Sequence, residues 1–208
     1  MKKIISGPIK LFGAYFLRFL MVSIGRTLKF KISDHTVLKE NVIFSIWHQC
    51  AFCLFEANPI PNSAVLTAKG GPGDIFTKAV AIYDAKIIQV PFDGNPADSA
   101  ATAAKLSAAL KEGYNLMLAV DGPKGPLHKI KPGIFFLAKR AKKRIIPIGV
   151  AASKKLTLRF RWDKYFIPLP FSTVAIYIDT GYVGDGSEGH LKAAMFEAEI
   201  KAKQMLQS

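Results

Sequence analysis

The stretch LMLAVDGPKGPLHKIKPG, Leu116–Gly133, decides the class of fold that this sequence predicts. It opens with an apolar run that is typical of a buried strand, and the run ends on Asp121. The residues that follow are rich in glycine, proline and basic side chains. Glycine and proline supply the backbone angles of a tight turn, but a turn does not need this charge pattern. We therefore expect a strand that delivers an acid and a basic loop to one edge of a sheet.

The rest of the chain alternates short apolar runs with segments of helical length. Strands are predicted over residues 42–46, 64–67, 86–90, 116–120, 145–151, 156–162 and 174–179, and helices over residues 48–57, 73–84, 96–112, 133–142 and 187–206. This alternation predicts a single α/β domain with a mixed or mostly parallel central sheet flanked by helices. In the last helix one face carries Leu191, Met195, Ala198 and Ala202. We expect that face to pack on the domain, although a partner could also use it.

The N-terminal segment combines basic residues with an apolar stretch. Lys2 and Lys3 precede LFGAYFLRFLMVSIG, Leu11–Gly25, which Arg18 interrupts. Spanning a bilayer takes about 20 mostly apolar residues, and a signal peptide needs a small-residue cleavage site, so neither fits. An interfacial helix with basic flanks fits better, and a core helix of the domain is the alternative. We expect a membrane-associating amphipathic helix over residues 1–32 and the α/β domain over residues 33–208.

The sequence is both apolar and basic. Half of its 208 residues are hydrophobic, and 29 Lys and Arg against 15 Asp and Glu give a net charge of +14. This combination indicates a protein that works on a negatively charged surface, either nucleic acid or anionic lipid. Its aromatic residues lie within apolar runs and not among lysines, and no nucleic-acid motif is present. We therefore expect an anionic membrane surface as the partner and no nucleic acid.

His48 is the first candidate for chemistry, because it directly follows the predicted strand 42–46. An imidazole at a strand-to-helix junction is well placed to accept a proton from a substrate hydroxyl. The carboxyl ends of parallel strands gather at the edge where ligands bind, so His48 and Asp121 could meet there. Cys50 and Cys53 have the spacing of a metal or redox pair, but no second cluster completes a zinc site. We interpret both cysteines as core residues, and their small number indicates a reducing cytosol.

The glycine-rich stretch KGGPGD, Lys69–Asp74, lacks the spacing of a P-loop. It is interpreted as a loop that leads into a helix near Ile75. The N-terminus of that helix, with Lys69 and Lys78 nearby, could hold a phosphate. A plain turn before the helix is the simpler interpretation.

Several of these stretches, in this order, resemble a known family. IWH, GDIFTK, DGPKGPLHKIKPG followed by IIPIGVA, and WDKYFIPLPFS are similar to blocks of the small bacterial lysophospholipid-acyltransferase-like proteins. These belong to the glycerolipid acyltransferase superfamily, to which the lipid A acyltransferases are more distantly related. The resemblance covers most of the chain after about residue 35. It implies a glycerolipid-acyltransferase-like fold and the transfer of a fatty acyl group from a thioester to a lipid hydroxyl.

The resemblance also implies roles for individual residues. His48 matches the catalytic histidine, which acts as the general base. The superfamily has an acid five positions after this histidine, whereas this chain has Cys53. If the chain is an acyltransferase, another acid must orient the imidazole, and Asp121 is the first choice and Glu56 the second.

The block that resembles the superfamily's headgroup-recognition motif supplies the predicted substrate-binding residues. Asp121 takes the place of its acid and Lys124 the approximate place of its arginine, with Gly122 and Gly125 offering backbone amides. Lys69 completes this predicted set. No metal and no cofactor are expected, because the acyl thioester of coenzyme A or of acyl carrier protein serves as co-substrate.

The resemblance places the expected reaction in phospholipid biosynthesis at the cytoplasmic face of the bacterial inner membrane. The protein would be peripheral or anchored by its N-terminus, with a lipid acceptor and acyl carrier protein as possible partners. Two alternatives stay open. Because Cys53 replaces the usual acid, the chain could be a catalytically degenerate lipid-binding protein. Its basic composition also suits a non-enzymatic module that binds membranes or nucleic acid.

Overall fold

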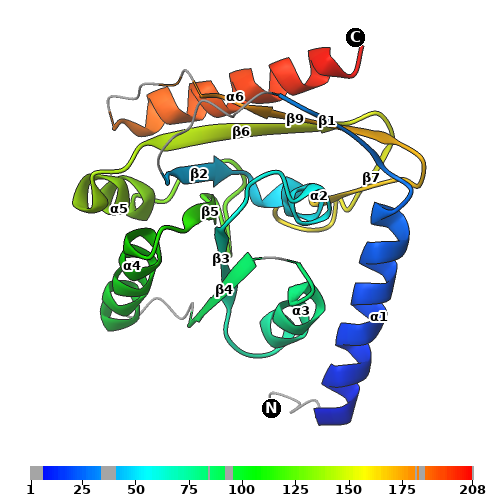
Figure 1. Ribbon diagram of the computed structural model, residues 1–208, viewed down its shortest axis with the longest axis horizontal. Helices are drawn as coiled ribbons and strands as arrows, with labels where there is room; N and C mark the ends of the chain where they lie inside the picture. Colours follow the sequence, from blue (N-terminus) through cyan, green and yellow to red (C-terminus); the bar gives the residue numbers. More distant parts are fainter. Residues whose placement is uncertain are drawn as a thin grey trace.

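The computed structural model describes residues 7–33, 41–83, 85–91, 96–180, 182 and 186–207. They form a single α/β domain around a seven-stranded sheet (Figure 1). The strands are β1 (Lys29–Ile32), β2 (Ile43–Ile46), β3 (Ser63–Ala68), β4 (Ala85–Val90), β5 (Asn115–Ala119), β6 (Ile145–Ala152), β7 (Lys155–Thr157), β8 (Phe166–Pro168) and β9 (Thr173–Ile178). The helices are α1 (Gly7–Gly25), α2 (Ala51–Ala57), α3 (Pro72–Val80), α4 (Pro96–Lys111), α5 (Gly133–Ala141) and α6 (Glu188–Met205), and a short 3-10 helix, η1 (His48–Cys50), precedes α2.

The central sheet is mostly parallel, as the sequence predicts. Its strand order is β1-β9-β6-β2-β5-β3-β4, and β7 pairs with β8 in a separate hairpin. The five strands from β6 to β4 run parallel to one another, whereas β9 is antiparallel to β6 and carries β1 parallel to itself. The carboxyl ends of β2, β5 and β3 consequently lie at the same edge, where the chain continues into His48, Asp121 and Lys69.

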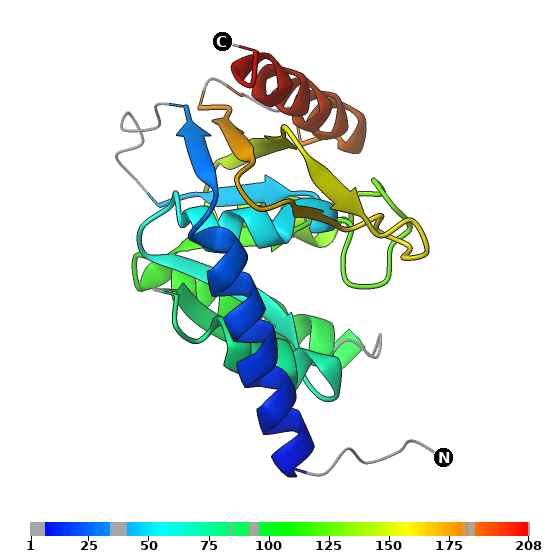
Figure 2. The same cartoon turned by 90° about the vertical axis from the view of Figure 1, so that its right-hand side faces the viewer.

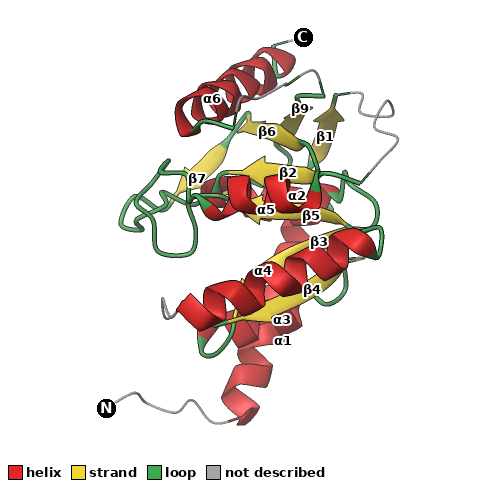
Figure 3. Ribbon diagram, turned by 90° about the vertical axis from the view of Figure 1, so that its left-hand side faces the viewer, coloured by secondary structure: helices red, strands yellow, loops and turns green. Residues whose placement is uncertain are grey.

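Helices cover both faces of the sheet and create two hydrophobic clusters. Side chains alternate between the faces, so that Phe44 of β2 packs with α1, α2 and α3, while its neighbour Ile43 packs with α4, α5 and α6. Figure 3 shows α4 and α5 in front of the strands and α6 at the top, beside β6 and β9. The predicted apolar face of α6, which includes Leu191 and Met195, is buried on the sheet. At Gly149 of β6 an added Cβ would lie 2.0 Å from the backbone of Ala198, so only glycine allows α6 this close an approach.

Helix α1 is apolar on two sides. Its inner side, with Ala14 and Met21 buried, packs against α2 and α3 and joins the core. Its outer side leaves a row of large apolar side chains exposed: Leu11, Phe12, Tyr15, Phe16, Phe19 and Leu20. One side of α1 is therefore part of the core, as the alternative interpretation expects, and the other side is an apolar face exposed to solvent. Among the described residues, no helix is both long and apolar enough to cross a bilayer. Lys2 and Lys3 lie outside the described residues.

Two parts of the sequence fold differently from the prediction. The predicted strand over residues 156–162 is wrong beyond Thr157, because residues 158–165 turn back to form the β7–β8 hairpin. Within this turn Asp163 accepts hydrogen bonds from the side chain of Arg161 and the amide of Tyr165, and the N–H of Leu158 donates to the carbonyl of Tyr165. The predicted N-terminal unit also contains β1, an edge strand of the main sheet, which the sequence analysis missed.

Candidate active site

His48 lies at the carboxyl edge of the sheet, directly after β2. Trp47 is fully buried and fixes the end of the strand, and the chain then enters η1. The backbone N–H of His48 donates to Oδ1 of Asp121 at 2.9 Å, which ties β2 to the loop after β5. The imidazole itself is 29% exposed, so one edge of the ring is accessible to a ligand.

The carboxylate that meets this imidazole belongs to Asp163. Its Oδ2 lies 2.7 Å from Nδ1 of His48. Because an ionised carboxylate only accepts hydrogen bonds, Nδ1 must carry the proton and donate it. This assignment of the tautomer leaves Nε2 with a free lone pair, as a general base requires.

Asp163 is held rigidly although it is fully buried. Arg161 donates to both of its oxygens, from Nε at 2.9 Å and from Nη2 at 2.8 Å, and the backbone N–H of Tyr165 donates at 3.2 Å. Burial raises the pKa of Asp163, but the hydrogen bonds from Arg161 and His48 outweigh it and leave that pKa below its usual value. The acid beside His48 is therefore ionised throughout the neutral range.

Asp121 has a different contact from the one predicted for it. Its fully buried carboxylate accepts backbone N–H groups, from His48 on Oδ1 and from His128 on Oδ2 at 3.1 Å. The prediction that Asp121 orients the imidazole is wrong, because its oxygens face the main chain and Asp163 occupies Nδ1. Asp121 instead cross-links the two loops that form the site.

The alternative prediction, that Glu56 orients the imidazole, is also wrong. Its carboxylate accepts a hydrogen bond from the hydroxyl of Tyr83 and lies against Gly25 at the end of α1. Burial raises the pKa of Glu56, opposed by that hydrogen bond. Glu56 thus helps to join α1 to the domain.

Replacing Asp121 by asparagine is expected to lower the free energy of unfolding by about 1–3 kcal/mol. An amide side chain has one acceptor oxygen, so it would leave one of the two backbone N–H groups of His48 and His128 without a partner in a buried place. Urea unfolding of wild type and variant at pH 7 measures the difference. A change below about 0.5 kcal/mol, which is typical of surface substitutions, would contradict this structural role.

The predicted glycines leave room for two rings at the site. An added Cβ on Gly122 would lie 3.1 Å from Cδ2 of His48, so the imidazole packs directly over this residue. Gly125 has a φ of +72°, and its added Cβ would lie 2.5 Å from Cε3 of Trp162. The indole of Trp162 lies 5.4 Å from the imidazole, measured between ring centroids. Both glycines therefore shape the site by their lack of a side chain.

The two predicted lysines lie at the same edge with exposed side chains. Lys124 is on the loop between Gly122 and Gly125, and Lys69 follows β3, two strands away from β2 in the sheet. The structure places neither lysine in contact with the imidazole. In the glycine-rich loop after Lys69, the N–H of Gly70 donates to Asp74 at 2.8 Å. The carboxylate of Asp74 thus accepts the hydrogen bond from this amide near the start of α3, as expected of a plain turn before a helix.

Cys50 and Cys53 are core residues, as predicted. Both thiols are free and buried, and burial raises the pKa of Cys53 to about 12. Burial likewise raises the pKa of Cys50. Such thiols are poor nucleophiles and poor metal ligands. Across the described ranges, no three His, Cys, Asp or Glu side chains are grouped so that they could hold a metal ion.

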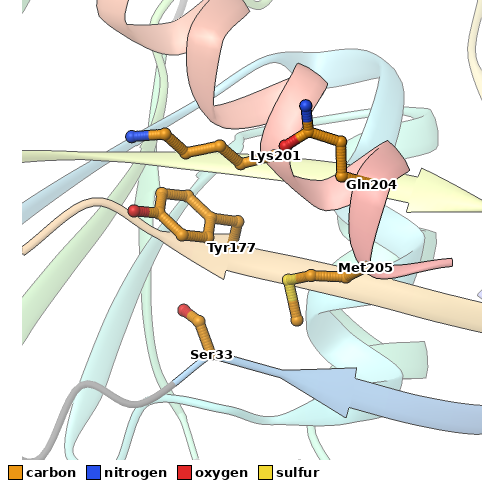
Figure 4. A pocket seen from close by; sticks show the side chains of 5 residues that line it. All are labelled: Ser33, Tyr177, Lys201, Gln204 and Met205. Atoms are coloured by element: carbon orange, nitrogen blue, oxygen red, sulfur yellow. The ribbon is translucent and has the colours of Figure 1, made fainter. Parts of the chain in front are cut away.

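The pocket shown in Figure 4 belongs to another part of the molecule. It has a volume of about 440 Å³ between α6 and the strands β9 and β1, and it is lined by Ser33, Tyr177, Lys201, Gln204 and Met205. Because β9 and β1 run opposite to β2, Ser33 at the end of β1 lies toward the opposite edge of the sheet. None of the residues predicted for the site lines this pocket.

Sequence analysis missed Asp163, Arg161 and Trp162, which complete the site. They lie in or beside the block WDKYFIPLPFS, which contributes to the family resemblance but matches no catalytic motif of it. Asp163 is 115 residues from His48, so no local spacing connects them. An acid within an aromatic and basic block is a signal that could have drawn attention to it.

Comparisons with known proteins address the fold. No protein-family profile matches the sequence. RP090, an uncharacterised protein of Rickettsia prowazekii (strain Madrid E), is 29% identical over 169 residues, which cover 79% of this chain and 73% of that protein. The crystal structure of PlsC, the 1-acyl-sn-glycerophosphate (LPA) acyltransferase of Thermotoga maritima, aligns with a TM-score of 0.51 at 11% sequence identity. That alignment covers 96% of this chain and 88% of PlsC. The protein therefore has an acyltransferase-like α/β fold.

Proposed function

We propose that this protein is an O-acyltransferase that moves a fatty acyl group from a thioester to a hydroxyl of a (lyso)phospholipid or related lipid. The observation that carries the proposal is the His48–Asp163 pair at the carboxyl edge of an acyltransferase-like sheet. Since Asp163 supplies the carboxylate for the imidazole, the cysteine at position 53 does not by itself argue for a degenerate site.

In the proposed reaction, Nε2 of His48 removes the proton from the acceptor hydroxyl as its oxygen attacks the thioester carbonyl. A tetrahedral oxyanion forms, the carbon–sulfur bond breaks, and the thiolate leaves with the proton that the imidazolium returns. Asp163 stabilises the imidazolium and keeps the proton on Nδ1. Neither a metal nor a redox cofactor takes part in these steps.

The basic loop after β5 is proposed to bind the acceptor. Lys124 is exposed on this loop, and a lysine ammonium attracts a phosphate as a point charge. Lys69 adds positive charge farther along the same edge. The predicted amides of Gly122 and Gly125 are not available for an oxyanion, because their N–H groups donate to the carbonyls of Ala119 and Asp121. Pro123 has no N–H, so the backbone N–H of Lys124 is the donor proposed from this stretch, and one such donor is worth about 2.7–4 kcal/mol.

Helix α1 is proposed to hold the protein on an anionic membrane, such as the cytoplasmic face of the inner membrane. Its exposed apolar face is wide enough to enter the acyl boundary, and Arg18, Arg26 and Lys29 are exposed on or beside the helix. The charge of the whole chain, +14, adds attraction to anionic headgroups. An acidic acyl carrier protein would also be attracted by this charge, and it is proposed as one of two thioester donors beside coenzyme A.

The proposal is tested by incubating the purified full chain with a long-chain acyl-CoA, or separately with acyl-acyl carrier protein, in the presence of lysophospholipids. Mass spectrometry follows the acylated lipid, and a thiol reagent follows the released carrier. We expect thioester loss and lipid acylation in equal amounts for at least one acceptor. Binding of lipid without acylation, or hydrolysis to free fatty acid with every acceptor, would overturn the proposal.

A further inference from the structure

The β7–β8 hairpin displays apolar side chains that the fold does not use. Phe160, at the turn of the hairpin, is 86% exposed, and Leu156 of β7 is 54% exposed. At the other end of the hairpin, Leu169 and Phe171 are exposed as well. Single exposed apolar residues are ordinary, so the charges around Phe160 decide whether it marks an interaction surface.

The same hairpin is strongly basic. Residues 153–164 contain Lys154, Lys155, Arg159, Arg161 and Lys164 against the single acid Asp163. Asp163 is buried and paired with Arg161, so it contributes no negative charge to the surface. The side chains of Arg159 and Lys164 are exposed on either side of Phe160 in the sequence. A phenylalanine between exposed cations suits the boundary between lipid headgroups and acyl chains.

The open end of the hairpin, away from Phe160, adjoins the end of α1. The backbone N–H of Phe171 donates to Oγ1 of Thr27 at 3.1 Å, just after the end of α1. Figures 1 and 2 show this end of the hairpin beside the end of the helix, on the same side of the molecule. The exposed Leu169 and Phe171 therefore lie near the end of α1, whereas Phe160 lies at the opposite end of the hairpin.

The turn of the hairpin also carries the residues that complete the candidate active site. Asp163 accepts the hydrogen bond from Nδ1 of His48, Arg161 donates to Asp163, and Trp162 packs against both the imidazole and Gly125. Phe160 is next to Arg161 in the chain. Whatever holds Phe160 in place therefore also restrains the loop that orients His48.

We propose that residues 154–164 form a second lipid-binding surface, in which Phe160 enters an anionic bilayer while Arg159 and Lys164 contact phosphate groups. The surface sets the mouth of the site against the bilayer and steadies Asp163 at His48. The catalytic consequence rests on the proposed function, whereas the lipid contact itself does not.

Vesicle binding tests this surface on the full chain. Vesicles of phosphatidylglycerol and phosphatidylcholine are compared with vesicles of phosphatidylcholine alone, and binding is measured by sedimentation. Phe160→Ser is expected to weaken partitioning to the anionic vesicles about ten-fold, the change for withdrawing most of one phenylalanine from lipid. Phe136→Ser is the matched control, because Phe136 is 57% exposed on α5, on the side of the molecule opposite α1 (Figure 1). Equal binding of wild type and Phe160→Ser would overturn the proposal.

A second measurement keeps the test independent of any change in folding. Lipids with brominated acyl chains should quench the emission of Trp162, which is two residues from Phe160, but not that of the buried Trp47. Trp162→Phe should remove the quenched emission. The double variant Arg159→Gln/Lys164→Gln should bind anionic vesicles more weakly than wild type does. It should also lose most of the preference for anionic over neutral vesicles. Absence of quenching, or an effect of Phe160→Ser on binding to acidic carrier protein but not to vesicles, would overturn the lipid assignment.

The two proposals fail in different ways. If Phe160-dependent vesicle binding is found but no acyl transfer occurs, the proposed function is wrong and the lipid surface stands. If acyl transfer occurs and Phe160→Ser binds vesicles like wild type, the surface is wrong and the proposed function stands.

Discussion

Replacing His48 by alanine is expected to lower kcat for acyl transfer roughly 10²–10⁴-fold, the usual contribution of a general base. The variant loses the atom that accepts the hydroxyl proton, while the backbone bond from residue 48 to Asp121 is retained. KM for the lipid acceptor should change little, because the proposed phosphate contacts come from Lys124 and Lys69, which follow other strands than His48 does. Steady-state turnover at saturating thioester measures both parameters.

The matched control is His190→Ala. His190 is on the first turn of α6, where its ring lies against Tyr182 and away from the carboxyl edge. We expect turnover like that of wild type from this variant. Full activity in His48→Ala, with the fold intact by circular dichroism, would rule out the mechanism.

Replacing Asp163 by asparagine is expected to lower kcat by a similar amount, roughly 10²–10⁴-fold. An amide can turn its NH₂ group toward Nδ1 of His48, which then accepts a hydrogen bond and leaves the proton on Nε2. The imidazole would remain in place but in the wrong tautomer for a base. The measurement is again kcat against KM, and a loss confined to KM would contradict this role.

The variant Arg161→Gln tests the contribution of the ion pair separately from that of the Asp163 carboxylate. This variant keeps Asp163 beside His48 but removes the fork that holds both oxygens. We expect a smaller loss of kcat than in Asp163→Asn, because the acid still sets the tautomer. An equal loss in both variants would mean that the ion pair, and not the contact with His48, is what matters.

The lowered pKa of Asp163 also predicts how stability responds to acid. A carboxyl whose pKa is lower in the folded than in the unfolded protein adds stability above the unfolded value of about 4. This contribution is lost as the pH falls through the folded pKa. Asp163→Asn should therefore unfold at less urea than wild type at pH 7, with the difference shrinking in acid.

Much of the fold could be predicted because it depends on local patterns. Apolar runs of strand length alternate with helical segments, and the predicted ranges for β2, β4 and β6 differ from the observed ones by about one residue. The β7–β8 hairpin could not be predicted in this way. Residues 156–162 have the composition of a strand, but in the structure the chain turns back after Thr157, with hydrogen bonds from Arg161 and Tyr165 to Asp163 and a backbone bond from Leu158 to Tyr165.

In the candidate site too, the features that depend on local patterns were predictable and the long-range contacts were not. The sequence by itself determined that His48 follows a strand and that Asp121 ends another, because strand ends can be read from where apolar runs stop. Parallel topology then brings both to one edge, which is a property of the fold class. The identity of the acid at the imidazole was decided only by the tertiary structure. Asp121 and Asp163 are both buried aspartates near His48, and the direction of each side chain determines which one meets the ring and which meets the main chain. The two sides of α1 differ for the same reason, since only packing against α2 and α3 selects which apolar residues are buried.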